Sequence, residues 1–598
     1  MSVQVEKQQA PTVSDPILVE VIRNYLISTC REMGQAMVRT SYSTMFNEAQ
    51  DFSCAIFDHE GEMVAQGEFC PAHIGAIVHT VEWCIKEVAR DNMEPGDVIF
   101  HNDPYRGGCH LPEFLTLKPV FIEGEIVAYC ANIAHMVDIG SAVPAAFGVT
   151  CNTFQDGLRL PPIKIYRNDR EVQDIIKILI SNTRQPRNNY GDLCAMVGSL
   201  YLAERRILDL FARYSDDGSL FQVFRDIKDV SEIMMRRAIG ELPNGEYPFE
   251  GYLEDDGVIP DKPWRIAGTL VIRDDSLIVD YTGSDPQSPG SINQSFGCTA
   301  SATYNAAFHL LGGADIPFNH GTYRPIHIIA PPGTVVNGQY PASVTCGNSD
   351  TYPTTVDIVL GALSRITGHG SAADGATVGL MGFYGTDPRS GETWVYLHQD
   401  GMGWGARDDH DGNDSQIVKN GNCLNTPVEI YETRYPVFID QYNLAIGSPG
   451  VGKFRGGHGT LREWTMETDV EYSVHSNRHV IRPWGMFGGG DGGNTKLQFR
   501  LPGADEWLDA KQAFGTISLG KFSNVILRKG TTIRLVMPGG GGWGAPLERD
   551  PLLVLADVAE ELITPEEAKE LYGVVVVDGE IDTTATEELR QGLRAREA

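Results

Sequence analysis

Residues 101–138 read HNDPYRGGCHLPEFLTLKPVFIEGEIVAYCANIAHMVD, and this stretch decides how the first part of the chain folds. Two apolar runs, 119–122 and 126–129, flank the turn residues Glu123, Gly124 and Glu125, which is typical of a β-hairpin. A hairpin returns the chain to its starting point. The polar residues before and after it are therefore expected to lie close together.

Those polar residues form two units in which a histidine precedes an acid by three positions, His110 with Glu113 and His135 with Asp138. Two imidazoles and a carboxylate are a usual ligand set for a divalent ion that keeps open positions for substrate or water. The pattern predicts a metal site formed by residues of these two units. Equally, histidines in such loops can serve only to satisfy buried carbonyls, and the residues alone leave both interpretations open.

Other residues of this region have less specific roles. Asp51 and Asp103 could complete or orient the ligand set. Whether His101 or Asp138 reaches the ion cannot be read from the spacing. Cys109 invites a nucleophilic-thiol interpretation, but no third group that would orient a base is identifiable, so a thiol mechanism is not favoured.

Composition excludes several functional classes. Among 598 residues there are 48 Lys and Arg against 79 Asp and Glu, a formal net charge of −31, which disfavours nucleic acid and anionic membranes as partners. No apolar window is long enough to span a bilayer. Residues 1–15 are polar and have no signal-peptide pattern, so a cytoplasmic protein is expected. Eleven cysteines without a Cys-x-x-Cys pair argue against a disulfide framework or a zinc ribbon.

The pattern along the chain predicts a multi-domain α+β protein. We expect an N-terminal α+β domain over 1–180, a helical segment over 181–240, a large β-rich region with many glycine loops over 241–545, and a short helical tail over 546–598. The first domain should open with a long helix capped by Asp15 and continue with a hairpin over 52–57 and 63–65.

Two glycine-rich loops resemble nucleotide-binding motifs but lack their context. Gly447 to Lys453 has P-loop spacing, yet Phe454 stands where magnesium needs a hydroxyl, and the following glycines cannot begin a helix. Gly488, Gly490 and Gly493 form a G-x-G-x-x-G that no helical pattern follows. We therefore expect no nucleotide site in this chain.

Taken together, six motifs give the chain a resemblance to the hydantoinase B family, the B-type chains of ATP-dependent hydantoinases and 5-oxoprolinases. They follow the family's order over nearly the whole sequence: Asp51-Phe52-Ser53-Cys54; Asn102-Asp103-Pro104-Tyr105 with Gly107, Gly108 and His110; 156–162 (DGLRLPP); 455–459 (RGGHG); 538–544 (PGGGGWG); and 572–575 (YGVV). No single motif is specific, but the set is.

The resemblance implies a subunit that works with a separate hydantoinase A-type ATPase subunit, which binds ATP and phosphorylates the substrate. The B-type chain then opens a cyclic amide with water or, in the related acetone and acetophenone carboxylases, joins carbon dioxide to an enol phosphate. A hetero-oligomer such as a dimer of heterodimers is implied. A third interpretation, not enzymatic, is a subunit that only stabilises the ATPase chain.

The resemblance also implies site residues. His110, Glu113 and His135 would bind zinc or manganese, Asp51 would be a further ligand or a base, and Asp51 or Asp138 would act as general base. Glu113 stands where related members more usually have aspartate, which lengthens one ligand arm. Met136 replaces a histidine common in hydrolytic relatives, which points to a more apolar substrate such as a lactam or an aryl ketone.

Overall fold

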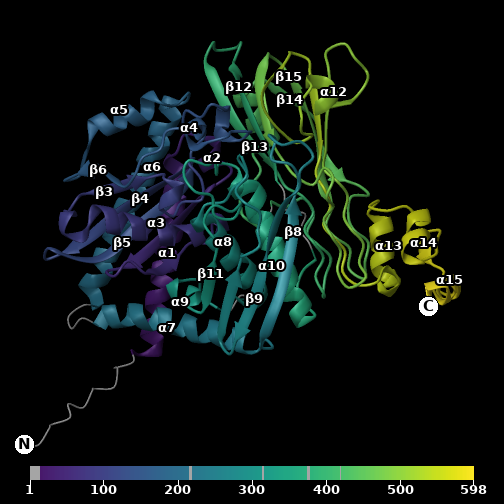
Figure 1. The fold of residues 1–598 in the computed structure, drawn as a ribbon, viewed down its shortest axis with the longest axis horizontal. Helices are drawn as coiled ribbons and strands as arrows, with labels where there is room; N and C mark the ends of the chain where they lie inside the picture. The colour runs from purple at the N-terminus through teal and green to yellow at the C-terminus, as the bar shows by residue number, and fades with distance from the viewer. Residues whose placement is uncertain (1–13, 215–218, 313–315, 373–377, 418, 598) are drawn as a thin grey trace, which may run out of the picture.

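The computed structural model describes residues 14–214, 219–312, 316–372, 378–417 and 419–597. The prediction that residues 1–15 have no signal-peptide pattern falls mainly on residues 1–13, which lie outside the described residues. The structure contains both helices and several sheets, which confirms the α+β prediction (Figure 1). Within the described residues no helix is long and apolar enough to cross a membrane.

The first layer is a seven-stranded sheet in the order β2-β1-β5-β4-β3-β6-β7. Its strands are β1 (Phe52–Asp58), β2 (Met63–Gln66), β3 (Val98–His101), β4 (Glu113–Ile122), β5 (Glu125–His135), β6 (Ile163–Arg167) and β7 (Arg170–Glu171). Both predicted hairpins are confirmed, β1 with β2 and β4 with β5.

Helices cover both faces of this sheet. On one face lie α1 (Pro16–Thr40), which Asp15 caps as expected, and α6 (Pro186–Tyr214), followed by α7 (Ser219–Gly240). On the other face lies α3 (Pro71–Val88). Because successive strand residues point to opposite faces, Phe52, Cys54 and Ile56 join the first core while Ala55 and Phe57 join the second. Shorter helices α2 (Thr44–Asn47), α4 (Thr153–Asp156) and α5 (Gln173–Ser181) connect these elements.

Between residues 241 and 545, the described part of the chain forms three more sheets. The first is β11-β10-β9-β8, with β8 (Gly245–Leu253), β9 (Trp264–Arg273), β10 (Ser276–Asp280) and β11 (Ile326–Ile329). The second is β13-β12-β16-β19, with β12 (Gly379–Thr386), β13 (Thr393–Asp400), β16 (Val470–His475) and β19 (Lys521–Leu527). The third is β14-β15-β20-β17-β18, with β14 (Val437–Ala445), β15 (Gly459–Met466), β17 (Lys496–Arg500), β18 (Leu508–Asp509) and β20 (Thr532–Val536).

This region also holds helices that the sequence pattern did not predict. α8 (Phe296–Ala307) packs between α3 and α10 (Tyr352–Thr367), and a π-helical turn over Gly347–Thr351 precedes α10. Most residues of α8 and α10 are buried, so neither has the polar stripe of a surface helix by which it could be recognised. Smaller helices are α9 (His320–Tyr323), α11 (Val428–Arg434) and α12 (Ala510–Phe514).

Extended glycine segments run from the upper sheets toward the C-terminal helices (Figure 1). They pair through backbone hydrogen bonds, such as Gly540 N–H to the Gly457 carbonyl and Gly457 N–H to the Trp404 carbonyl. A Cβ on Gly540 would collide with the Trp404 carbonyl. Only glycine permits this close backbone approach. The two nucleotide-like loops belong to this part of the molecule, and each leads into a strand, β15 or β17, rather than a helix, as predicted.

The helical tail comprises α13 (Pro551–Ala559), α14 (Pro565–Tyr572) and α15 (Thr583–Glu597), with the short strands β21 (Val576–Val577) and β22 (Glu580–Ile581). Thr564 forms the predicted capping box. Buried Arg549 joins the tail to the glycine segments, because its guanidinium contacts Asp411 at 2.6 Å and Asp557 at 2.8 Å. All eleven cysteines are free, which confirms that there is no disulfide framework.

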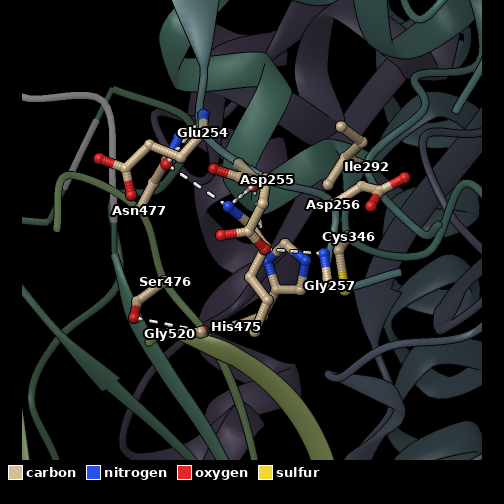
Figure 2. Close-up of polar contacts among 12 residues, drawn as sticks. Glu254, Asp255, Asp256, Gly257, Ile292, Cys346, His475, Ser476, Asn477 and Gly520 are labelled. Carbon is tan, nitrogen blue, oxygen red and sulfur yellow. Dashed lines mark hydrogen bonds and ion pairs between the residues drawn. The ribbon is translucent and has the colours of Figure 1, made fainter. Parts of the chain in front are cut away.

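A buried polar cluster lies where the chain after β8 meets β16, and Figure 2 shows Glu254, Asp255, His475 and Asn477 close together there. Lys521 is buried beside them, with Nζ 3.3 Å from Asp350 Oδ2 and 3.4 Å from Asn477 Oδ1. Burial raises the pKa of Asp350, and the Lys521 charge opposes that rise. The ammonium group therefore compensates a carboxylate that water does not reach.

Lys521→Met should destabilise the protein strongly, because it leaves Asp350 buried without its cation, a loss of about 3–5 kcal/mol. The measurement is the unfolding midpoint in urea. Lys511→Met removes the exposed Lys511–Asp261 pair and should cost less than about 1 kcal/mol. Equal midpoints for the two variants would contradict this account of the cluster.

Candidate metal centre

The register of three adjacent strands brings three of the predicted residues together. Glu113 on β4 lies directly opposite His135 on β5, and the His135 N–H donates to the carbonyl of Asp51, the residue before β1, at 3.0 Å. All three lie at the same end of the sheet. The hairpin argument from the sequence is therefore confirmed for Glu113 and His135.

His110 enters from the loop before β4. Its Nε2 lies 3.2 Å from Glu113 Oε1, and its ring centroid lies 5.1 Å from that of His135. A carbonyl can only accept, so His110 Nδ1, 2.8 Å from the Thr345 carbonyl, carries the proton. This turns Nε2 toward the cluster, where it meets the Glu113 carboxylate. An imidazole fixed by its other nitrogen in this way is the usual arrangement of a metal-binding histidine.

The electrostatics keep these groups in states that bind metal. Burial alone would raise the pKa of Glu113, but His110 and His73 hold it well below its usual range. Burial, with His110 nearby, lowers the pKa of His135 to about 3, so this imidazole is neutral at pH 7. Both ring nitrogens of His135 are buried without a hydrogen-bond partner among the described residues. A neutral imidazole without such partners has one lone pair available to a divalent cation, which needs deprotonated ligands.

The structure adds two side chains that the sequence pattern did not single out. His73, in the first turn of α3, lies 3.4 Å from Glu113 Oε1 and 3.7 Å from Asp51 Oδ1. Asn348 Nδ2 lies 3.2 Å from the same Glu113 oxygen and 3.3 Å from His110 Nε2. The Cys-x-x-His spacing of Cys70 and His73 at a helix start could have identified His73. Asn348 is contributed by a distant segment and has no local signal.

The contacts of Asp138 are with residues outside this centre. It accepts hydrogen bonds from the N–H of Gly140 and of Arg184 and from the Thr183 hydroxyl, and it pairs with the Arg184 guanidinium at 2.8 Å. These contacts anchor the end of β5 to the segment before α6. A carboxylate occupied in this way is a poor candidate for a general base, and Asp51 is the stronger one.

The remaining candidates of this region have structural partners. His101 Nδ1 accepts from the Asp103 N–H at 3.2 Å, and Asp103 pairs with Arg106 and with Arg159. The Cys109 thiol lies 3.6 Å from the Ala72 carbonyl, while its N–H donates to Glu113 Oε2 at 3.3 Å. Cys109 therefore positions Glu113 through its backbone.

A cavity of about 760 Å³ adjoins the centre. Gln399 on its wall donates from Nε2 to Asp51 Oδ2 at 3.3 Å, which places the cavity next to that carboxylate. Six aromatic side chains line it: Phe69, Tyr304, Phe308, Phe318, Tyr323 and Trp404. Arg407 and Lys419 add positive charge to the wall. Such a cavity suits an apolar ring that carries an anionic group.

Asp156 supports the segment that positions His110. It is buried and accepts from the hydroxyls of Thr150 at 2.6 Å and Ser343 at 2.8 Å, two residues before Thr345. Burial raises the pKa of Asp156 from 3.8 to about 6, although the two hydrogen bonds by themselves lower it. A carboxyl group whose pKa is raised on folding stabilises the folded state below its unfolded pKa and loses that contribution as the pH rises through the folded value.

Asp156→Asn should therefore gain stability relative to the parent protein as the pH rises from about 4 to about 6, by about 3 kcal/mol in total. Deprotonating a buried carboxyl group destabilises the parent over this window, and the amide has no proton to lose. Unfolding midpoints of both proteins measured from pH 4 to pH 8 test this. A difference that stays constant with pH would contradict the raised pKa.

Comparisons with known proteins agree with the fold and the motifs. The model of the family described as hydantoinase B/oxoprolinase matches residues 15–546. A protein of Pseudomonas sp. (strain NS671), named as the B chain of a D-/L-hydantoinase, is 33% identical over 96% of this chain and 98% of its own length.

Solved structures give the same result. The crystal structure of the ATP-dependent caprolactamase from Pseudomonas jessenii superposes with a TM-score of 0.87, at 30% identity over 97% of this chain and 100% of that one. Nucleotide-free acetone carboxylase superposes with a TM-score of 0.86, over 98% of this chain and 83% of that one, but at 18% identity this likeness concerns the fold alone.

Proposed function

Because this chain belongs to the hydantoinase B/oxoprolinase family, whose members are enzymes, we propose that it is the catalytic subunit of an ATP-dependent cyclic amide hydrolase. It would open the ring of a hydantoin, lactam or oxoproline that a separate hydantoinase A-type ATPase subunit has phosphorylated. The observation that carries this proposal is the buried cluster of histidines and carboxylates beside a cavity that six aromatic side chains help to line.

In this proposal His110, Glu113, His135 and Asp51 hold a divalent ion, zinc or manganese. The donor set fits, because the Thr345 carbonyl at His110 Nδ1 leaves Nε2 turned toward Glu113, and His135 has no competing hydrogen bond among the described residues. When bound, such an ion lowers the pKa of water and polarises a carbonyl or phosphoryl oxygen.

The chain's own residues orient the reactants. The aromatic walls bind the ring and exclude water from it. Arg407 and Lys419 attract the phosphate of the activated substrate. Asp51 lies between Gln399 on the cavity wall and His73 in the cluster, so its carboxylate is the group placed to take the proton from an attacking water. Gln399 donates to one carboxylate oxygen and so orients it.

The names of the relatives support a partner subunit. The matched hydantoinase chain is named as one subunit of its enzyme, and neither glycine loop of this chain has the helix that a phosphate-binding loop needs. We therefore place ATP on the partner, in a hetero-oligomer such as a dimer of heterodimers. The likeness in fold to acetone carboxylase makes an ATP-dependent ketone carboxylase the second candidate.

His110→Ala combined with His135→Ala should remove the bound metal and lower turnover by at least about 100-fold, because two of the proposed ligands are lost. Metal content by inductively coupled plasma mass spectrometry and ADP release report the two effects. His327→Ala, an exposed histidine on β11, is the control and should change neither. Full activity in the double variant would refute the catalytic role of the centre.

Substrate class is tested by ADP release from the chain co-purified with its native partner. Hydantoins, lactams and oxoproline are compared with ketones, each with and without bicarbonate. ADP formation with a cyclic amide in the absence of bicarbonate would support the hydrolase. Turnover only with a ketone and bicarbonate would replace it by the carboxylase, since hydrolysis needs no carbon dioxide.

A further inference from the structure

The start of α3 carries a second group of metal-ligating side chains. Cys70 is the N-cap residue of this helix, and His73 lies three residues later. Ligand atoms of Asp51, Cys70 and His73 all lie within 4.8 Å of one another. The three side chains are buried, with relative exposures of 7%, 4% and 1%. Thiolate, imidazole and carboxylate are the three ligand types that zinc takes in proteins.

This group adjoins the centre described above through its carboxylates. His73 Nε2 lies 3.4 Å from Glu113 Oε1. On its other side, the same oxygen lies 3.2 Å from His110 Nε2. Glu113 therefore lies between two imidazoles, and Asp51 contacts His73 as well. Carboxylates flanked by nitrogen ligands on both sides are the arrangement that a pair of divalent ions requires, as in the two-metal hydrolases.

The local environment of Cys70 and His73 suits metal binding. Cys70 is the N-cap residue of α3, and its thiol donates to the Asn420 carbonyl at 3.1 Å, a hydrogen bond that metal ligation would replace. His73 Nδ1 is buried without a hydrogen-bond partner among the described residues. Such a nitrogen calls for an explanation, and an ion bound beside it supplies one.

We propose that Asp51, Cys70 and His73 form a second metal position, selective for zinc, next to the position at His110, Glu113 and His135, with the carboxylates of Asp51 and Glu113 shared between the two. The first position rests on the proposed function, whereas the second rests on the Cys70–His73 pair. Two ions at shared carboxylates would let one orient the substrate oxygen while the other acts on water.

Metal stoichiometry tests the proposal on the metal-depleted full chain reloaded with zinc. The parent should bind two ions per chain. Cys70→Ser should bind one, because it removes the thiolate, and His110→Ala should also bind one, because it removes a ligand of the other position. Cys84→Ser is the matched control, since its thiol is also buried on α3 but lies later in the helix than His73; it should keep two.

Cobalt substitution supplies a readout that is independent of activity. A cobalt–thiolate bond absorbs in the near ultraviolet by charge transfer. The parent, His110→Ala and Cys84→Ser should show this band, and Cys70→Ser should lose it. If Cys70→Ser does not fold, Cys70→Asp provides an oxygen ligand in its place and should bind two ions without the band.

The outcomes separate the two positions. One zinc per chain and no thiolate band in the parent would overturn the second position while leaving the first intact. One ion per chain together with the band would also overturn the shared arrangement, because the single ion would then lie at Cys70. A band that persists in Cys70→Ser would show that another cysteine binds, and would refute the assignment. Retention of two ions in His110→Ala would count against the first position instead.

Discussion

The antiparallel register of β1, β5 and β4 is the constraint on which the candidate centre depends. Opposite residues on neighbouring strands face the same side, so the pairing of Glu113 with His135 fixes both side chains relative to each other. A slip of one residue would turn one of them to the opposite face. The helices that bury both faces of this sheet hold the register, because each face contributes to its own hydrophobic core. Catalytic geometry and stability therefore depend on the same strand pairs.

The centre is completed by segments that are remote in sequence. The Thr345 carbonyl fixes the tautomer of His110, and Asn348 contacts both His110 and Glu113. Both come from the chain just before α10, more than two hundred positions along the sequence from the hairpin. The helices α8 and α10 hold this segment against α3. The β-rich part of the chain thus contributes to the site directly, and the N-terminal sheet does not form it alone.

Local patterns predicted the elements whose signals are local. The α+β class, the capped first helix, both hairpins and the capping box at Thr564 depend on short-range periodicity and turn residues, and the structure contains them all. The hairpin also predicted that Glu113 and His135 lie together. In contrast, α8 and α10 are buried on nearly all sides and have no amphipathic pattern. His73 and Asn348 join the site through tertiary packing, and spacing within one segment cannot reveal such contacts.

The glycine segments have a consequence for how this protein can diversify. Where two backbone segments are in contact, as at Gly540 and Trp404, the glycine cannot be replaced, because a side chain would not fit. That part of the molecule is a fixed frame in which natural selection can change very little. The cavity wall is different, because Phe69, Phe308 and Phe318 present side chains that can be enlarged, shortened or made polar without disturbing the frame. New substrate preferences would therefore arise in the few side chains of this wall, while the glycine frame keeps its sequence.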